Sequence, residues 1–312
     1  MVQTNSLKSK IIIICGATAT GKSDLAIECA KLLDTEIISA DSMYIYKGLN
    51  VGTAKPSIEE MQGIKHHLID VISPKDTFTV SDYKNLAEPI INDLLKKGKT
   101  PIICGGTGFY INSILYDLSY GNGKDNSKVR EKYKDLADCH GNQYVYEILK
   151  KVDPETASKL HFNDLKRVIR ALEIYENGVK KSDIKDEFIP KYDYLAYSIS
   201  YPREELYDRI NTRVDLMVDS GLVEEIKGLI NVGIDKSDQC MQAIGYKEIF
   251  DYFDGVCTLE QAVENIKLNT RHYAKRQITY FKRLPNLINL QKDNTKNLAR
   301  TILKDLHNND WL

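Results

Sequence analysis

The chain has 312 residues, 42% of them hydrophobic and 28% charged, which is typical of a folded globular protein and excludes a disordered or fibrous one. Lys and Arg number 43 against 44 Asp and Glu, and this net charge of −1 argues against polyanion binding over the whole surface. The six cysteines include no CxxC pair, which indicates neither a zinc site nor a disulfide framework and suits the reducing cytoplasm. The apolar run Ile11–Cys15 is too short for a membrane span or a signal peptide.

The first third of the sequence predicts strands that alternate with helices. Four short apolar segments are typical of strands: Ile11–Cys15, Glu36–Ser39, Leu68–Ile72 and Pro101–Cys104. Apolar residues at helical spacing predict one helix over Lys22–Leu33 and another from an N-cap near Thr79 to Lys97. This alternation indicates an α/β fold with a parallel sheet flanked by helices.

After Tyr116 the character of the sequence changes to mostly charged and helical. A loop is predicted at Ser119–Lys128, because Gly, Asn and Ser cluster there, and helices are predicted from that loop to Glu176. We therefore expect residues 119–191 to form a mainly helical inserted domain.

One further strand is predicted at Tyr194–Tyr201, and the sequence then predicts helices up to Arg283. A short strand near Leu287–Leu290 and a last helix end the chain. Residues 1–118 and 192–312 are thus expected to form a P-loop NTPase-like catalytic core with basic helices toward its C-terminus.

A phosphate-binding loop follows the first predicted strand. The motif G-x-x-x-x-G-K-S/T is matched at each fixed position by Gly16, Ala17, Thr18, Ala19, Thr20, Gly21, Lys22 and Ser23. Backbone amides of such a loop bind phosphate oxygens, while Lys22 supplies a positive charge and Ser23 can bind Mg²⁺. The motif leaves the phosphate compound open, since a diphosphate satisfies it as well as a triphosphate.

The carboxylate expected near this loop is not in its usual place. In a typical P-loop NTPase an apolar strand ends in Asp, but Pro101–Cys104 runs into glycines instead. Asp41 and Ser42 follow the second strand, at the sheet edge where α/β proteins bind ligands. The alternative for Asp41 is a purely structural turn or helix cap.

Several segments, in this order, resemble bacterial tRNA dimethylallyltransferases, the IPP transferase family. Besides the phosphate loop, they are Asp41–Gly48, Val51–Pro56, His66–Asp70, Gly105–Tyr110, Arg167–Glu173, Gln242–Lys247 and Thr270–Gln277. The family usually has Gln where this chain has Tyr44, and the Ser119–Ser127 loop lacks the proline-rich character common there.

The resemblance implies transfer of a dimethylallyl group from dimethylallyl diphosphate to N6 of adenosine 37 in tRNAs that read codons beginning with U, with Mg²⁺ as cofactor and release of diphosphate. An adenine amino group is a poor nucleophile, so a base that accepts its proton is valuable, and Asp41 is the candidate. Lys22, Arg213 and Ser23 with Mg²⁺ would stabilise the leaving diphosphate. Thr107 belongs to the catalytic channel in the family, and the enzyme is expected to act as a monomer.

The resemblance also implies contacts with the anticodon stem-loop of the tRNA. The residues concerned are Asp41, Ser42, Met43, Tyr44, Lys166, Arg167, Arg170, Gln242, Gly245, Tyr246, Lys247, Arg271, Lys275 and Arg276. Independently of the family, Ile266–Arg283 holds six basic and no acidic residues. Lys267, Arg271 and Lys275 would share one helix face, Tyr273, Arg276 and Tyr280 another, and Ala274, Ile278 and Phe281 the core.

Structural alternatives exist for each of these groups. Arg213, one helical turn from Arg209, could belong to a solvated face with Glu205 and Asp208. Salt bridges with Asp164, Glu173 or Glu176 are the alternative for Lys166, Arg167 and Arg170. An ordinary helix start is the alternative for Gln242–Lys247. The basic helix could simply be a solvated face.

Three other functions compete with the leading hypothesis. An adenylate isopentenyltransferase shares the phosphate loop but acts on free AMP, ADP or ATP, which would need neither the insertion nor the basic helix. A P-loop kinase lacks support because the strand after the long helix ends in Gly105 rather than Asp. A non-catalytic RNA-binding adaptor would leave the complete phosphate loop unexplained.

Overall fold

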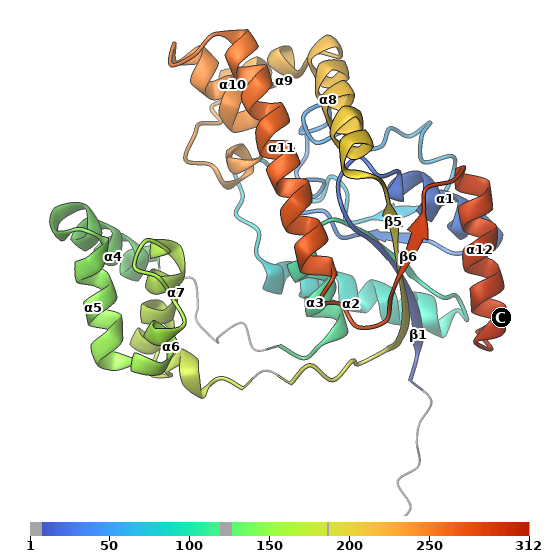
Figure 1. Ribbon diagram of the computed structural model, residues 1–312, viewed down its shortest axis with the longest axis horizontal. Helices are drawn as coiled ribbons and strands as arrows, with labels where there is room; N and C mark the ends of the chain where they lie inside the picture. Colours follow the sequence, from blue (N-terminus) through green and yellow to red (C-terminus); the bar gives the residue numbers. More distant parts are fainter. Residues whose placement is uncertain (1–7, 119–126, 186, 312) are drawn as a thin grey trace, which may run out of the picture. The chain divides into compact units, whose positions relative to one another are not determined.

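The structure, a computed structural model, describes residues 8–118, 127–185 and 187–311 (Figure 1). These residues form two compact units. One contains the described residues up to Leu115 together with those from Pro190 onward, and the other lies between Tyr116 and Ile189. The sequence-based boundaries were 118 and 192.

The first unit is built on a parallel sheet of six strands in the order β3-β2-β4-β1-β5-β6. The strands are β1 Lys10–Cys15, β2 Ile37–Ser39, β3 His66–His67, β4 Ile102–Gly105, β5 Asp193–Ser200 and β6 Leu287–Gln291. Ile11, Ile12, Ile13 and Ile14 of β1 are fully buried, because helices cover both faces of the sheet. The predicted α/β fold with a parallel sheet is confirmed.

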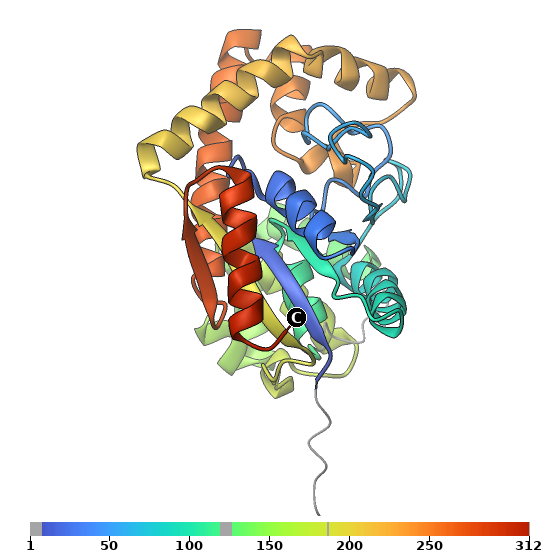
Figure 2. The same cartoon turned by 90° about the vertical axis from the view of Figure 1, so that its right-hand side faces the viewer.

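The described part of the first unit also contains eight α-helices. They are α1 Lys22–Leu32, α2 Val80–Lys96, α3 Gly108–Leu115, α8 Arg203–Asp219, α9 Leu222–Asn231, α10 Tyr246–Phe253, α11 Leu259–Phe281 and α12 Thr295–Asn308. Helices α1 and α12 lie side by side over one face, where Ile12 and Ile14 pack with Leu298 and Ile302 (Figures 1 and 2). No described helix is long and apolar enough to cross a membrane.

The predicted long helix begins as expected at Thr79. The Thr79 hydroxyl accepts a hydrogen bond from the Asp82 amide, and the Asp82 carboxylate accepts one from the Thr79 amide. The prediction of a strand at Leu68–Ile72 is wrong, since β3 spans only His66–His67. Leu68 and Asp70 have φ angles of 62° and 55°, and a left-handed backbone cannot continue a strand.

The second unit consists of helices around a core of its own. They are α4 Ser127–His140, α5 Asn142–Val152, α6 Pro154–Ser158 and α7 Leu165–Glu176, followed by the 3₁₀ turn Lys181–Asp183. Tyr133, Val145, Leu149, Val168 and Leu172 are buried in that core. Of the predicted loop Ser119–Lys128, residues 119–126 lie outside the described residues, and the last two belong to α4 rather than to a loop.

Asp153 is a buried polar anchor inside the second unit. Its buried carboxylate accepts hydrogen bonds from the amides of Thr156 and Ser182, both at 3.0 Å. Burial opposes ionisation, but these hydrogen bonds outweigh it and lower the pKa of Asp153 to about 2.

Replacing Asp153 with alanine is expected to destabilise the protein by about 3 kcal/mol at pH 7, because two amides lose a charged acceptor. The wild-type carboxylate is stabilising while ionised, so the difference between the two proteins should shrink as the pH falls from about 4 toward 2. Urea unfolding at several pH values measures both effects, and a difference independent of pH over that range would contradict the assignment.

Candidate active site

The phosphate loop lies between β1 and α1, as predicted. Gly16 and Gly21 have φ angles of 126° and 83°, which side chains with a Cβ rarely adopt. Lys22 Nζ and Thr20 Oγ1 both donate hydrogen bonds to the Ala17 carbonyl oxygen, at 2.5 and 2.9 Å, and so hold the loop curled. Burial lowers the pKa of Lys22, and an anionic partner bound in the loop would favour its charged form.

Three loops meet at the carboxyl ends of β1, β4 and β2, which are neighbours in the sheet. The second loop, Gly105–Gly108, is fitted closely to the third, because a Cβ on Gly105 would lie 2.2 Å from the Ala40 carbonyl oxygen. The Thr107 amide donates to that carbonyl, and Thr107 Oγ1 accepts from the Ser42 amide at 3.0 Å. These hydrogen bonds hold Thr107 next to Asp41, the residue that precedes Ser42.

Asp41 has a structural role and also faces open space. Its Oδ1 accepts a hydrogen bond from the Met43 amide at 2.9 Å, so Asp41 does cap a turn, as the structural alternative predicted. Among the described residues no hydrogen bond to Oδ2 is found, and Asp41 lines two cavities. One carboxylate oxygen thus fixes the turn while the other is available to a ligand.

The two cavities adjoin each other. The phosphate loop lines the smaller one, of about 260 Å³, together with Asp24, Tyr44 and Glu60. The larger, of about 430 Å³, is mainly apolar and is lined by residues that include Met43, Ile210, Val214, Met217 and Ile244. Both are lined by Thr18, Asp41, Thr53, Arg213 and Tyr273. Ligands in the two cavities would therefore meet beside Asp41.

Arg213 of α8 is half-buried and lines both cavities, whereas Arg209, one helical turn away, is exposed, lines neither cavity and touches the phosphate loop. Arg213 Nη2 lies 3.4 Å from the Thr53 carbonyl oxygen, and Arg209 Nε donates to the Ala19 carbonyl oxygen at 2.8 Å. Glu205, one of the two acids in the alternative, pairs with Lys292 instead. The structure thus favours a site role for Arg213. Sequence reasoning did not select Arg209, although its spacing of four from Arg213 was a usable signal.

Sequence reasoning also missed Gln277 of α11, which joins two of the three loops. Its Oε1 accepts from the Thr18 amide at 2.9 Å and its Nε2 donates to the Gly106 carbonyl oxygen at 3.0 Å. A side chain at Gly106 would displace this amide, because a Cβ would lie 2.2 Å from that Nε2. Its signals in the sequence were its place at the end of the family-resembling segment Thr270–Gln277 and a polar side chain on the inward face of a basic helix.

The Gln277→Leu variant is expected to bind inorganic diphosphate about tenfold more weakly, because it loses the hydrogen bond that orients the Thr18 amide. Gln143→Leu, on the surface of α5, is the matched control and should bind like wild type. Isothermal titration calorimetry measures both affinities. Unchanged binding by Gln277→Leu would show that the phosphate loop keeps its shape without this residue.

The surroundings of the basic residues on α11 differ in part from the sequence-based prediction. Lys275 and Arg276 are exposed, and Arg271 donates to Asn211 Oδ1 at 2.7 Å. Lys267, however, pairs with Asp215 and Glu264 and so does not share a face of unpaired cations. Ile278 is 39% exposed, so its placement in the core is wrong, whereas Ala274 and Phe281 are buried as predicted.

The segment after Asp41 contributes to both cavities. Ser42 and Met43 line the larger one. Tyr44 lines the smaller one, and its hydroxyl donates to the Ala54 carbonyl oxygen at 2.9 Å. Burial, and after it the charge of Asp41, raises the pKa of Tyr44. The ring that replaces the usual Gln is therefore anchored on the phosphate side of the site.

Gln242–Lys247 contains a glycine turn that begins α10. Gly245 has a φ of 100° and precedes the first helical residue, which agrees with the helix-start alternative. Gln242 lines the larger cavity and Lys247 is exposed. Tyr246 is fully buried and donates a hydrogen bond to Glu225, so the prediction of a direct contact between its side chain and RNA is wrong.

In the second unit, two of three predicted RNA contacts are also ion-paired. Arg170 lies 2.7 Å from the buried carboxylate of Glu173, and Arg167 lies 3.4 Å from Asp164. Burial opposes ionisation of Glu173, but hydrogen bonds from Arg170 and Arg130 lower its pKa. Lys166 is exposed.

A phosphate loop and two joined cavities at the edge of a parallel sheet define this protein as a P-loop-like α/β enzyme with separate places for a phosphate compound and a second substrate. Residues 44–284 match the family model described as IPP transferase. The chain is an enzyme of the IPP transferase family.

Similar proteins agree with this assignment. A tRNA dimethylallyltransferase of Thermoanaerobacter sp. (strain X514) is 50% identical over 279 residues, covering 88% of this chain and 89% of the relative. One from Alkaliphilus oremlandii is 46% identical and covers 96% of this chain and 97% of the relative. The crystal structure of a tRNA isopentenylpyrophosphate transferase from Bacillus halodurans has a TM-score of 0.72 at 38% identity, covering 96% of this chain and 98% of that one. A eukaryotic dimethylallyltransferase acting on tRNA has a TM-score of 0.81 at 29% identity, covering 96% and 80%.

Proposed function

We propose that this enzyme transfers a dimethylallyl group from dimethylallyl diphosphate to N6 of adenosine 37 in tRNAs that read codons beginning with U, and releases diphosphate. The observation that carries the proposal is the shared wall of the two cavities, where Asp41 and Arg213 lie together. The names of the similar proteins support the choice of substrates.

The smaller cavity suits the diphosphate. Amides of the phosphate loop and the charge of Lys22 would bind its oxygens, and Arg213 would lie on the side that faces the larger cavity. An allylic carbon–oxygen bond breaks readily once the departing diphosphate is stabilised. Fixed cations and amides aimed at the developing charge can supply that stabilisation without a covalent intermediate.

The donors around the smaller cavity fit a magnesium ion. The Ser23 hydroxyl lines it together with the carboxylates of Asp24 and Glu60. Burial, followed by the charge of Glu60, raises the pKa of Asp24. A nearby cation would favour the ionised carboxylate and lower that pKa again. Ser23 would help to hold the ion, which binds mainly through phosphate oxygens and water and would neutralise charge on the diphosphate.

The larger cavity suits a flipped adenine. Its walls are mainly apolar, and Asp41 lies where it joins the smaller cavity. The available carboxylate oxygen would accept the N6 proton as the carbon–nitrogen bond forms. Thr107 would act by holding the Ser42 amide and so the position of Asp41.

The exposed cations of α11 would bind tRNA phosphates. Replacing both Lys275 and Arg276 with alanine is expected to weaken tRNA binding and to lower the slope of log Kd against log salt by about 1 to 2. The matched control replaces Lys296 and Arg300, both exposed on α12, and should leave the slope unchanged. Filter binding at several salt concentrations measures both. Equal slopes in the two double variants would place the footprint elsewhere.

A label-transfer experiment separates the proposal from its nearest rival. With labelled dimethylallyl diphosphate, Mg²⁺ and equal concentrations of tRNA and AMP, label is expected in tRNA only. Label in AMP would favour an adenylate isopentenyltransferase instead. Phosphoryl transfer from ATP without prenyl transfer would favour a kinase.

A further inference from the structure

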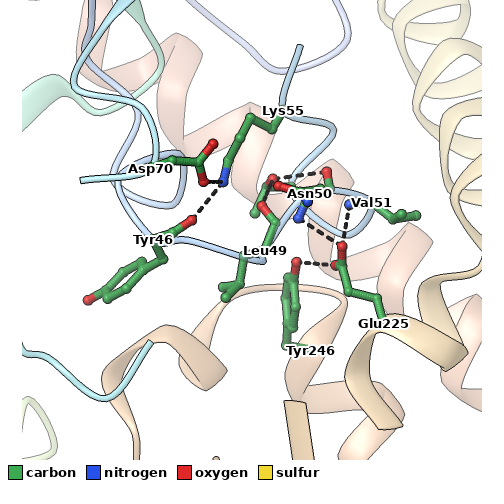
Figure 3. Close-up of polar contacts among 9 residues, drawn as sticks. Tyr46, Leu49, Asn50, Val51, Lys55, Asp70, Glu225 and Tyr246 are labelled. Atoms are coloured by element: carbon green, nitrogen blue, oxygen red, sulfur yellow. Dashed lines mark hydrogen bonds and ion pairs between the residues drawn. The ribbon is translucent and has the colours of Figure 1, made fainter. Parts of the chain in front are cut away.

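Glu225 anchors a segment that forms part of both cavity walls. It lies in the first turn of α9, and its carboxylate accepts four hydrogen bonds. Figure 3 shows those from Asn50, Val51 and Tyr246. Oε2 accepts from the amides of Asn50 and Val51 at 2.8 and 2.7 Å. Oε1 accepts from the Gly52 amide at 3.1 Å and from the Tyr246 hydroxyl at 2.6 Å. Three successive amides are thus fixed by one side chain.

The segment Asn50–Lys55, which we call the strap, is tied at its other end as well. Lys55 Nζ donates to the Tyr46 carbonyl oxygen and to Asp70 Oδ1, each at 2.6 Å (Figure 3). The Lys55 side chain is only 3% exposed, so this ion pair is partly shielded from water. The strap is held between two charged side chains.

The middle of the strap faces the reaction site. Gly52 lines the larger cavity, and Thr53 lines both cavities and offers its carbonyl oxygen to Arg213. The backbone passes close to the Tyr246 ring, since a Cβ on Gly52 would lie 2.6 Å from it. A displaced strap would therefore move the cavity wall and the acceptor that orients Arg213.

We propose that Glu225, supported by Tyr246, is a positioning residue for the transfer reaction. It touches neither substrate. It holds the strap so that the Thr53 carbonyl oxygen keeps Arg213 in place beside Asp41. The inference rests on the proposed function. It assigns the buried Tyr246 to this network and gives it no part in tRNA affinity, which comes mainly from phosphate contacts at the surface.

Three variants test this inference. Glu225→Gln replaces a carboxylate oxygen with an NH₂ group that cannot accept from the strap amides. Tyr246→Phe keeps the ring packing and removes one donor. Glu224→Gln makes the same change of charge at the exposed neighbouring residue and is the control.

Glu225→Gln is expected to lower kcat per folded molecule by about 10-fold to 100-fold, as small misplacements of reacting groups do. Tyr246→Phe should show a smaller loss of the same kind, and Glu224→Gln none. The Kd for tRNA should stay within about twofold in all three. Backbone hydrogen exchange of peptides that cover residues 49–55 should rise in Glu225→Gln and less in Tyr246→Phe.

A kcat for Glu225→Gln equal to that of Glu224→Gln would overturn the inference. So would a Tyr246→Phe variant that weakens tRNA binding while kcat stays normal, because that result assigns Tyr246 to RNA contact. If Glu225→Gln does not fold, Tyr246→Phe decides between these outcomes. Absence of transfer by the wild-type protein would instead overturn the proposed function, a result that the variants cannot produce.

Discussion

Asp41→Asn is expected to lower kcat for prenyl transfer by about 10³-fold, since general-base catalysis contributes on the order of 10² to 10⁴. Asparagine keeps an oxygen that can accept from the Met43 amide, so the turn after β2 should survive. The variant therefore removes the base and leaves the turn cap, which separates the two roles of this residue. Single-turnover transfer to tRNA measures the effect.

Asp93→Asn is the matched control, because Asp93 forms only an exposed pair with Lys97 on α2. It should transfer at the wild-type rate. The Kd of Asp41→Asn for dimethylallyl diphosphate should change far less than its kcat. A variant that transfers at more than about a tenth of the wild-type rate would exclude Asp41 as the general base.

Lys22→Ala should raise the Kd for dimethylallyl diphosphate by about 100-fold, because it removes a charged donor and the hydrogen bond to the Ala17 carbonyl oxygen. Lys31→Ala, on the exposed face of the same helix, is the control. Binding measured by calorimetry in the presence of Mg²⁺ gives both values.

The pH dependence provides a second test of Lys22. Burial lowers the pKa of Lys22, so in the wild type the ammonium is lost at a lower pH than for an exposed lysine. Diphosphate affinity should fall as the pH rises through that lowered pKa, and Lys22→Ala should lack this fall. The same pH profile in both proteins would assign the titration to another group.

Local features of the site could be predicted from the sequence. The phosphate loop is a contiguous motif between a strand and a helix, and Asp41 follows a strand that ends at the same sheet edge. The β3 prediction failed because left-handed φ angles at Leu68 and Asp70 depend on the hydrogen bonds of the surrounding loop, which the apolar pattern does not encode.

The remaining errors concern side chains whose partners are distant in the sequence. Lys267 is neutralised by Asp215, and Tyr246 is buried on Glu225. Gln277 contacts the phosphate loop across 259 residues. Although Tyr246 and Gln277 lie in family-resembling segments, those segments do not reveal their partners, because the contacts follow from how the helices pack around the site.

Mass spectrometry of nucleosides from tRNA incubated with the wild-type enzyme, dimethylallyl diphosphate and Mg²⁺ tests the central claim most directly. We expect a new adenosine that carries one isopentenyl group, located at position 37 by digestion and sequencing of the tRNA, and absent with Asp41→Asn. Unmodified tRNA after incubation with folded wild-type protein would contradict the account.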